Sequence, residues 1–166
     1  MMYYSASMNT LDESLMNAVK EGKLLESSRT NIRLLLDGTK SPIAHEAVEE
    51  LAAAGEWQEL NDRFYKTLAF GTGGLRGRTI GSIVTRAEQG NGGVNGRPEY
   101  PCVGTACMNY FNVGRAMRGL IIYVNKHVEA TDPGRKPRLV IGHDTRHFSR
   151  DFAEFCAKIG TDLGLS

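Results

Sequence analysis

Residues 70–78 read Phe-Gly-Thr-Gly-Gly-Leu-Arg-Gly-Arg, a stretch that we call the glycine loop. Glycine tolerates positive φ and lets neighbouring N–H groups converge on an anion, and arginine offers a planar fork of donors to phosphate oxygens. We therefore expect the glycine loop to bind a phosphorylated ligand. The alternative is a turn that only reverses the chain. Nucleotide binding is disfavoured, because the spacing matches neither a P-loop nor a dinucleotide fingerprint.

The composition indicates a soluble protein without a nucleic-acid or membrane partner. Among its 166 residues are 20 Lys plus Arg and 19 Asp plus Glu, so the net charge of +1 creates no field that would recruit polyanions. Cys102, Cys107 and Cys156 are odd in number and form no Cys-x-x-Cys pair, which argues against a disulfide framework or a zinc site. No secretory leader and no apolar run of roughly 20 residues is present. We expect a cytoplasmic protein.

Apolar residues recur with helical spacing between about Leu11 and Leu68, and we expect three or four short helices there. Gly22, Gly38 and Gly55 mark the expected breaks, because glycine can adopt the left-handed conformation after a helix end.

One helix should start at Ser41-Pro42, with serine as the cap and proline in the first turn. Two apolar stripes predict packing faces, and they comprise Ile43, Ala47, Leu51 and Ala54, then Trp57, Leu60, Phe64 and Leu68.

Turn-forming residues dominate residues 86–102, so we expect a long irregular loop there. The longest helical pattern follows at residues 105–128. A short apolar run at residues 138–142 then predicts a strand that is covered on both faces, as in a parallel sheet.

Asp144 and Arg146 follow directly after that predicted strand. Ligands bind at this edge of open α/β sheets, so the two side chains are candidates for support of an active site. They could equally form a structural pair that fixes the turn, and both interpretations stay open. Ser149 is expected to cap the final helix.

The glycine loop and the later turn together resemble the phosphohexomutases, the family of phosphoglucomutases and phosphomannomutases. That family carries Phe-Gly-Thr-(Ser/Ala/Gly)-Gly-Leu-Arg, which residues 70–76 match, and Gly-x-Asp-x-Arg, which Gly142, Asp144 and Arg146 match. Residues 61–68 look like the long-chain branch of the family. The resemblance begins at about residue 57.

The resemblance implies an α/β fold. Residues 69–166 would form the first part of a three-layer α/β/α mixed-sheet domain, and residues 1–68 would form a helical N-terminal extension. It also implies an isomerase of carbohydrate metabolism that interconverts hexose 1-phosphate and hexose 6-phosphate. This intramolecular phosphotransferase would use a phosphoserine, Mg²⁺ and a hexose 1,6-bisphosphate intermediate.

Carried over to this sequence, Arg76 would be the catalytic residue that contacts the phosphoryl group. Thr72, Gly73 and Gly74 would bind phosphate together with Arg76. Asp144 and Arg146 would support the active site.

The chain departs from the family pattern in two loops. It contains neither the family's Thr-Ala-Ser-His-Asn-Pro phosphoserine loop nor its Asp-x-Asp-x-Asp metal loop, so we assign no metal ligand. We expect an N-terminal part of a phosphohexomutase, inactive alone, whose partners are a phosphosugar and the rest of the mutase chain. The alternative is a non-catalytic module that binds a phosphosugar or another protein.

Overall fold

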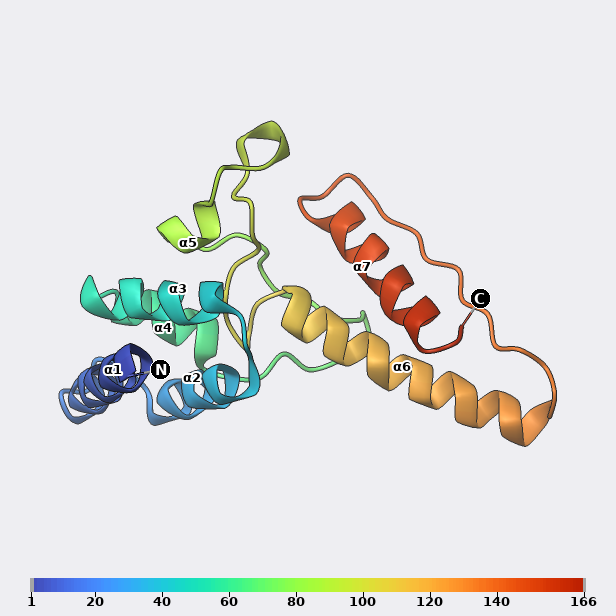
Figure 1. Ribbon diagram of the computed structural model, residues 1–166, viewed down its shortest axis with the longest axis horizontal. Helices are drawn as coiled ribbons and strands as arrows, with labels where there is room; N and C mark the ends of the chain where they lie inside the picture. The colour runs from blue at the N-terminus through green and yellow to red at the C-terminus, as the bar shows by residue number, and fades with distance from the viewer. Residues whose placement is uncertain (1, 166) are drawn as a thin grey trace. The chain divides into compact units, whose positions relative to one another are not determined.

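The computed structural model in Figure 1 describes residues 2–165 of the chain, with side chains from residue 10 onward. The chain divides into two compact units, Met1–Met108 and Asn109–Ser166. The glycine loop belongs to the first unit, together with the helices that precede it. None of the helices in the described residues is long and apolar enough to cross a membrane.

The first unit begins with four helices, which confirms the prediction of three or four. They are α1 (Met2–Lys20), α2 (Glu26–Gly38), α3 (Pro42–Ala53) and α4 (Trp57–Phe64). Gly22 and Gly55 lie at predicted breaks and have φ values of 71° and 73°, which only glycine adopts readily. Gly38 differs, because it is the last residue of α2 and the extended residue Thr39 makes the break.

Helix α3 starts where the Ser-Pro pair predicts. Pro42 is its first residue. Proline lacks an N–H, and this costs nothing there because an N–H in the first turn has no acceptor within the helix. Ser41 occupies the N-cap position as predicted, but its side chain makes no capping hydrogen bond. Its backbone N–H instead donates to Oγ1 of Thr39 over 3.1 Å.

Apolar side chains from all four helices form one core. Those with 2% or less of their surface exposed are Leu15, Ile32, Ala47, Val48, Leu51, Leu60 and Phe64. Both predicted stripes contribute, although Ala54 is exposed. Burying a leucine or phenylalanine side chain stabilises a fold by about 1.5–3 kcal/mol, so this core is the main reason why the helices stay together.

A charged side chain lies inside this unit, at Arg63 of α4, and none of it is exposed. Its Nε donates to Glu59 over 2.7 Å, and its two terminal nitrogens donate to the two carboxylate oxygens of Glu88. Further donations reach the carbonyls of Ile83 and Val103. Burial alone would lower the pKa of Arg63, but Cys102 and the carboxylates of Glu88 and Glu59 together outweigh burial and raise it. Arg63 therefore stays charged and joins segments far apart in sequence.

Glu88 is held in place by helix α5 (Arg86–Gln89). Thr85 caps this helix: its Oγ1 accepts from the N–H of Glu88, and the Glu88 carboxylate accepts from the N–H of Thr85. The N–H of Val103 also donates to Glu88, over 2.8 Å. The Glu88 carboxylate thus accepts hydrogen bonds from Arg63 and from the backbone N–H groups of Thr85 and Val103.

The predicted loop at residues 86–102 is largely irregular but contains two short helices, α5 and η1 (Val94–Gly96). The expectation that no regular element forms there is wrong at α5, because the cap at Thr85 satisfies its first N–H groups. Asn95 in η1 has a φ of 60°, a left-handed value that asparagine tolerates.

The second unit consists mainly of α6 (Tyr110–Thr131) and α7 (Ser149–Asp162), which pack on each other. Their core contains Met117, Ile121, Ile159 and Leu165. Gly114 permits the close approach, because a Cβ there would lie 3.1 Å from the ring of Phe155. Helix α6 begins later than predicted, since Asn109 caps it by accepting from the N–H of Asn112 over 3.1 Å.

The predicted α/β fold is wrong. Within residues 2–165 the chain forms no strand, and therefore no three-layer α/β/α mixed sheet in residues 69–166. The predicted strand at residues 138–142 is irregular, and Val140 is fully exposed. The physical reason is that a strand needs a neighbour to pair its backbone groups, and the described part of the chain offers none to this segment.

We predict that Arg63→Ala strongly destabilises the first unit, because it leaves the buried carboxylates of Glu59 and Glu88 without their cation. Removing one partner of a buried ion pair costs about 3–5 kcal/mol. Urea unfolding followed by the fluorescence of Trp57, the only tryptophan, measures it. Arg33→Ala is the control, since that arginine is largely exposed, and it should change stability by less than about 0.5 kcal/mol. Equal unfolding midpoints for the two variants would contradict the prediction.

Candidate functional site

The glycine loop forms a tight turn after α4. The N–H of Gly74 donates to the carbonyl of Gly71 over 2.9 Å, and the reverse bond measures 3.3 Å, so the two residues form an antiparallel bridge. Gly74 has a φ of 84°, which disfavours any other residue. Thr72 and Gly73 therefore lie at the tip of the turn.

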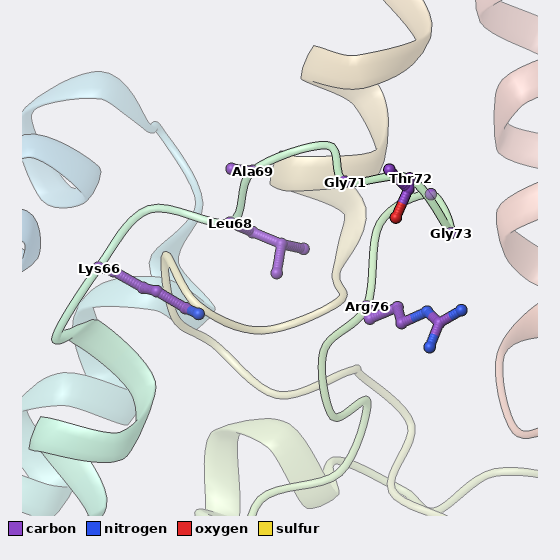
Figure 2. Close-up of a pocket in the computed structure, with 8 residues that line it drawn as sticks. Lys66, Leu68, Ala69, Gly71, Thr72, Gly73 and Arg76 are labelled. Carbon is purple, nitrogen blue, oxygen red and sulfur yellow. The ribbon is translucent and has the colours of Figure 1, made fainter.

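A cavity of about 340 Å³ lies against this turn, and Figure 2 shows the residues around it. They are Lys66, Leu68, Ala69, Gly71, Thr72, Gly73, Gly74 and Arg76. All four residues predicted to bind phosphate are in this set. Lys66 is an addition that the sequence reasoning missed, although its charge and its place just before the loop could have suggested it.

Arg76 is exposed and extends beneath the tip of the turn, as Figure 2 shows. Its guanidinium lies over Gly73, where a Cβ would be 2.1 Å from one of its terminal nitrogens. Within residues 2–165, no ion pair or hydrogen bond holds the Arg76 side chain. Its donors are therefore presented to the cavity and to solvent.

Arg78, the second arginine of the glycine loop, has a different environment. One of its terminal nitrogens lies 3.0 Å from Glu59, as an ion pair without the alignment of a hydrogen bond, and the other donates to Ser82 over 2.9 Å. Burial alone would lower the pKa of Arg78, but the Glu59 carboxylate outweighs burial and raises it. Arg78 thus anchors the loop, while Arg76 remains available.

Residues 102–108 hold both ends of the glycine loop, and we call this segment the brace. Before the loop, the N–H of Leu68 donates to the carbonyl of Thr105 over 2.7 Å, and the Thr105 hydroxyl donates to the carbonyl of Lys66 over 2.8 Å. After the loop, the N–H of Met108 donates to the carbonyl of Arg78 over 2.9 Å. Hydrogen bonds to the brace therefore fix the glycine loop at both of its ends.

Gly77 lies directly against the brace. A Cβ at this position would be 2.9 Å from both the carbonyl oxygen of Ala106 and the nitrogen of Met108. Both are backbone atoms, so neither can rotate away. The glycine at position 77 is required for the loop to pack on the brace.

Asp144 and Arg146 lie in the second unit, whereas the glycine loop lies in the first. The Arg146 guanidinium donates to Asp144 over 2.7 Å, and the Arg146 N–H donates to the same carboxylate over 3.0 Å. The pKa of Asp144 is lowered, mainly by the hydrogen bond from the Arg146 N–H and also by the side chains of Ser149 and Arg146. This geometry favours the structural pair among the two interpretations, and support of an active site remains a prediction.

The predicted capping role of Ser149 is wrong. Ser149 is the first residue of α7, and its Oγ accepts from the N–H of Asp144 over 3.1 Å. Phe148 precedes the helix with a φ of 65°, and its buried ring stacks on Phe152. Packing of this ring, rather than a polar cap, fixes the start of α7.

Residues 2–165 contain no group of three or more His, Cys, Asp or Glu side chains that could hold a metal ion. The residues described do not form a cage for the Mg²⁺ that the phosphohexomutase resemblance implies, and we derive no chemical step through it.

Comparisons with protein-family models, curated proteins and solved structures find no match to this chain. The resemblance to phosphohexomutases consequently depends on the motif residues themselves, chiefly residues 70–78 and 142–146.

We predict that Gly77→Ala destabilises the first unit, because its methyl group would force the backbone of the brace away from the loop. Overpacking of this kind costs about 1–3 kcal/mol. Urea unfolding followed by Trp57 fluorescence measures the loss. Gly38→Ala is the matched control, since nothing lies within 4 Å of a Cβ there. If Gly77→Ala unfolded at the same urea concentration as Gly38→Ala, the packing of loop on brace would be refuted.

Proposed function

We propose that the glycine loop binds the phosphate group of a phosphorylated sugar, as part of a phosphohexomutase that interconverts hexose 1-phosphate and hexose 6-phosphate. The observation that carries this proposal is the cavity at the loop. Its lining contains two cations, Lys66 and Arg76, and no Asp or Glu among the described residues. The chain as a whole has a net charge of only +1, so the positive charge is a local property of this cavity.

Each part of the cavity has a role in this proposal. Arg76 pairs with two phosphate oxygens at once, because its donors form a planar fork. Lys66 adds a point charge from the other side of the loop. The Thr72 hydroxyl and the N–H groups of Gly73 and Gly74 donate to the remaining oxygens. The cavity size of about 340 Å³ suits a ligand of this kind, since small-molecule sites measure about 300–1,000 Å³.

The proposed chemistry follows from the same geometry. Phosphoryl transfer places charge on three equatorial oxygens, so catalysis depends mainly on positioning and on stabilising that charge. Arg76 supplies such stabilisation, and the brace keeps the loop in position. The phosphoserine and the magnesium ligands of the phosphohexomutase would come from other parts of the mutase.

Exposed apolar side chains favour a second candidate, a protein-interaction module. In the second unit, Ile122, Tyr123 and Val140 are all more than half exposed. Large exposed apolar groups often mark surfaces that another protein covers. This candidate requires no anion binding at Arg76, so a phosphate titration separates it from the first.

We predict that Arg76→Ala weakens the binding of inorganic phosphate and of glucose 1-phosphate by about tenfold or more, because a charge-assisted hydrogen bond is lost. Isothermal titration calorimetry measures both affinities. Arg150→Ala is the matched control, since Arg150 is an exposed arginine on α7 that pairs with Glu154, and its affinities should equal those of the wild type. Unchanged affinity in Arg76→Ala, with the protein folded, would exclude the proposed site.

We also predict that residues 1–166 alone do not convert glucose 1-phosphate to glucose 6-phosphate. None of Thr72, Ser149 and Ser166 has a neighbouring base in a recognisable sequence arrangement, which a hydroxyl nucleophile needs. A coupled assay for glucose 6-phosphate, with Mg²⁺ and glucose 1,6-bisphosphate added, tests this. Turnover that Arg76→Ala abolishes would show that the chain carries its own nucleophile.

A further inference from the structure

Cys102 and Cys107 face each other inside the first unit, with 3.3 Å between their Sγ atoms. Both are buried, with 2% and 1% of their surfaces exposed. A disulfide bond measures about 2.05 Å, so the sulfur atoms need to approach by only about 1.3 Å. Small side-chain rotations can supply this movement.

The surroundings of the two thiols give them different reactivities. The contact between the two thiols lowers the pKa of Cys107 against the effect of burial, and the nearby cations Arg63 and Arg78 lower it further. The same contact, together with burial, raises the pKa of Cys102. Because the thiolate is the reactive form, these directions favour Cys107 as the nucleophile and Cys102 as the thiol that completes the bond.

The two cysteines also occupy the brace, at positions that control the glycine loop. The N–H of Cys102 donates to the carbonyl of Thr79 over 2.8 Å, and Met108, next to Cys107, donates to Arg78. Thr105, which lies between the cysteines, holds Lys66 and Leu68. A covalent link from Cys102 to Cys107 would therefore close a ring across the segment from which the loop is suspended.

We propose that Cys102 and Cys107 form a reversible disulfide in response to a peroxide, and that this bond locks the brace. The proposal does not depend on phosphate binding. A peroxide is suitable because it is small and neutral, and both thiols are buried.

The chemistry balances in two steps. The Cys107 thiolate attacks one oxygen of hydrogen peroxide, the O–O bond breaks, and a sulfenic acid and hydroxide form. Cys102 Sγ then attacks the sulfenic sulfur, the S–O bond breaks, and water leaves as the disulfide forms. The two thiol protons end in water, so two thiols and one peroxide give one disulfide and two waters. Two molecules of a small thiol then reduce the disulfide by exchange and leave as a disulfide of their own, which restores both cysteine thiols.

Mass spectrometry of the full chain tests the proposal. Trypsin releases both cysteines in the peptide 87–115, because Pro98 protects the bond after Arg97, and it releases Cys156 separately in the peptide 151–158. After hydrogen peroxide treatment, unfolding and alkylation, the peptide 87–115 should be unalkylated and two hydrogens lighter than its reduced form. Dithiothreitol should restore two alkylation sites. Two alkylated cysteines, sulfinic acid at either position or a link to Cys156 would overturn the proposal.

Single variants separate the two roles. In Cys102→Ser, Cys107 should stop at the sulfenic acid, which dimedone traps. In Cys107→Ser, dimedone labelling of Cys102 should be lower than that of Cys107 in Cys102→Ser, because burial still raises the pKa of Cys102, whereas Arg78 lowers that of Cys107. Cys156→Ser is the control and should form the disulfide as the wild type does. Equal labelling of Cys102 and Cys107 would contradict the assigned order of attack.

Hydrogen exchange tests whether the disulfide locks the brace. The amides of Leu68 and Met108 donate across the contacts between brace and loop. In the oxidised protein these two amides should exchange at least about tenfold more slowly than in the reduced protein, since a cross-link restricts the opened chain. Unchanged exchange in protein that mass spectrometry shows to be oxidised would refute the locking effect.

Discussion

The first unit depends on the neutralisation of one buried cation, the guanidinium of Arg63. A buried charge is expensive unless it is paired and hydrogen-bonded, and Arg63 achieves this with Glu59, Glu88 and two carbonyl groups. These partners come from α4, from Ile83 in the segment before α5, from α5 and from the brace. Because guanidinium geometry is planar and its charge is fixed, the partners must hold these segments in one arrangement. The apolar core brings the helices together, and the buried ion network specifies how the loops that follow are attached.

The same network positions the candidate site. Glu59 contacts Arg63 on one side and Arg78 on the other, so the buried charges continue into the glycine loop. The carbonyl of Arg63 accepts from the N–H of Ala106 in the brace, which connects the network to the second support of the loop. Arg76, two residues before Arg78, is left outside the network. A site supported by rigid elements is more precisely placed than a site on an unsupported loop.

Close backbone contact explains several glycines of this region. A Cβ at Gly81 would collide with the Arg63 guanidinium, and a Cβ at Gly104 would lie 2.6 Å from the Arg63 carbonyl oxygen. Glycine at positions 81 and 104 therefore lets the backbone pack closely against Arg63, and Gly77 does the same against the brace. Glycines of this region therefore serve packing, whether or not the loop binds an anion. The phosphate interpretation needs only Gly73 and Gly74 beside Arg76.

Local sequence determined the four N-terminal helices, the start at Pro42 and the tight turn at residues 70–78, because helical periodicity, proline and glycine act on near neighbours in the chain. The run at residues 138–142 was misleading, since a β-branched pattern cannot form a strand without a partner. Only the tertiary structure decided that Arg63 is buried, that Arg78 is paired while Arg76 is exposed, and that Cys102 meets Cys107. These outcomes depend on contacts such as the one between Arg63 and Glu88, which are 25 positions apart, and the charge of a side chain does not tell which distant residue it will meet.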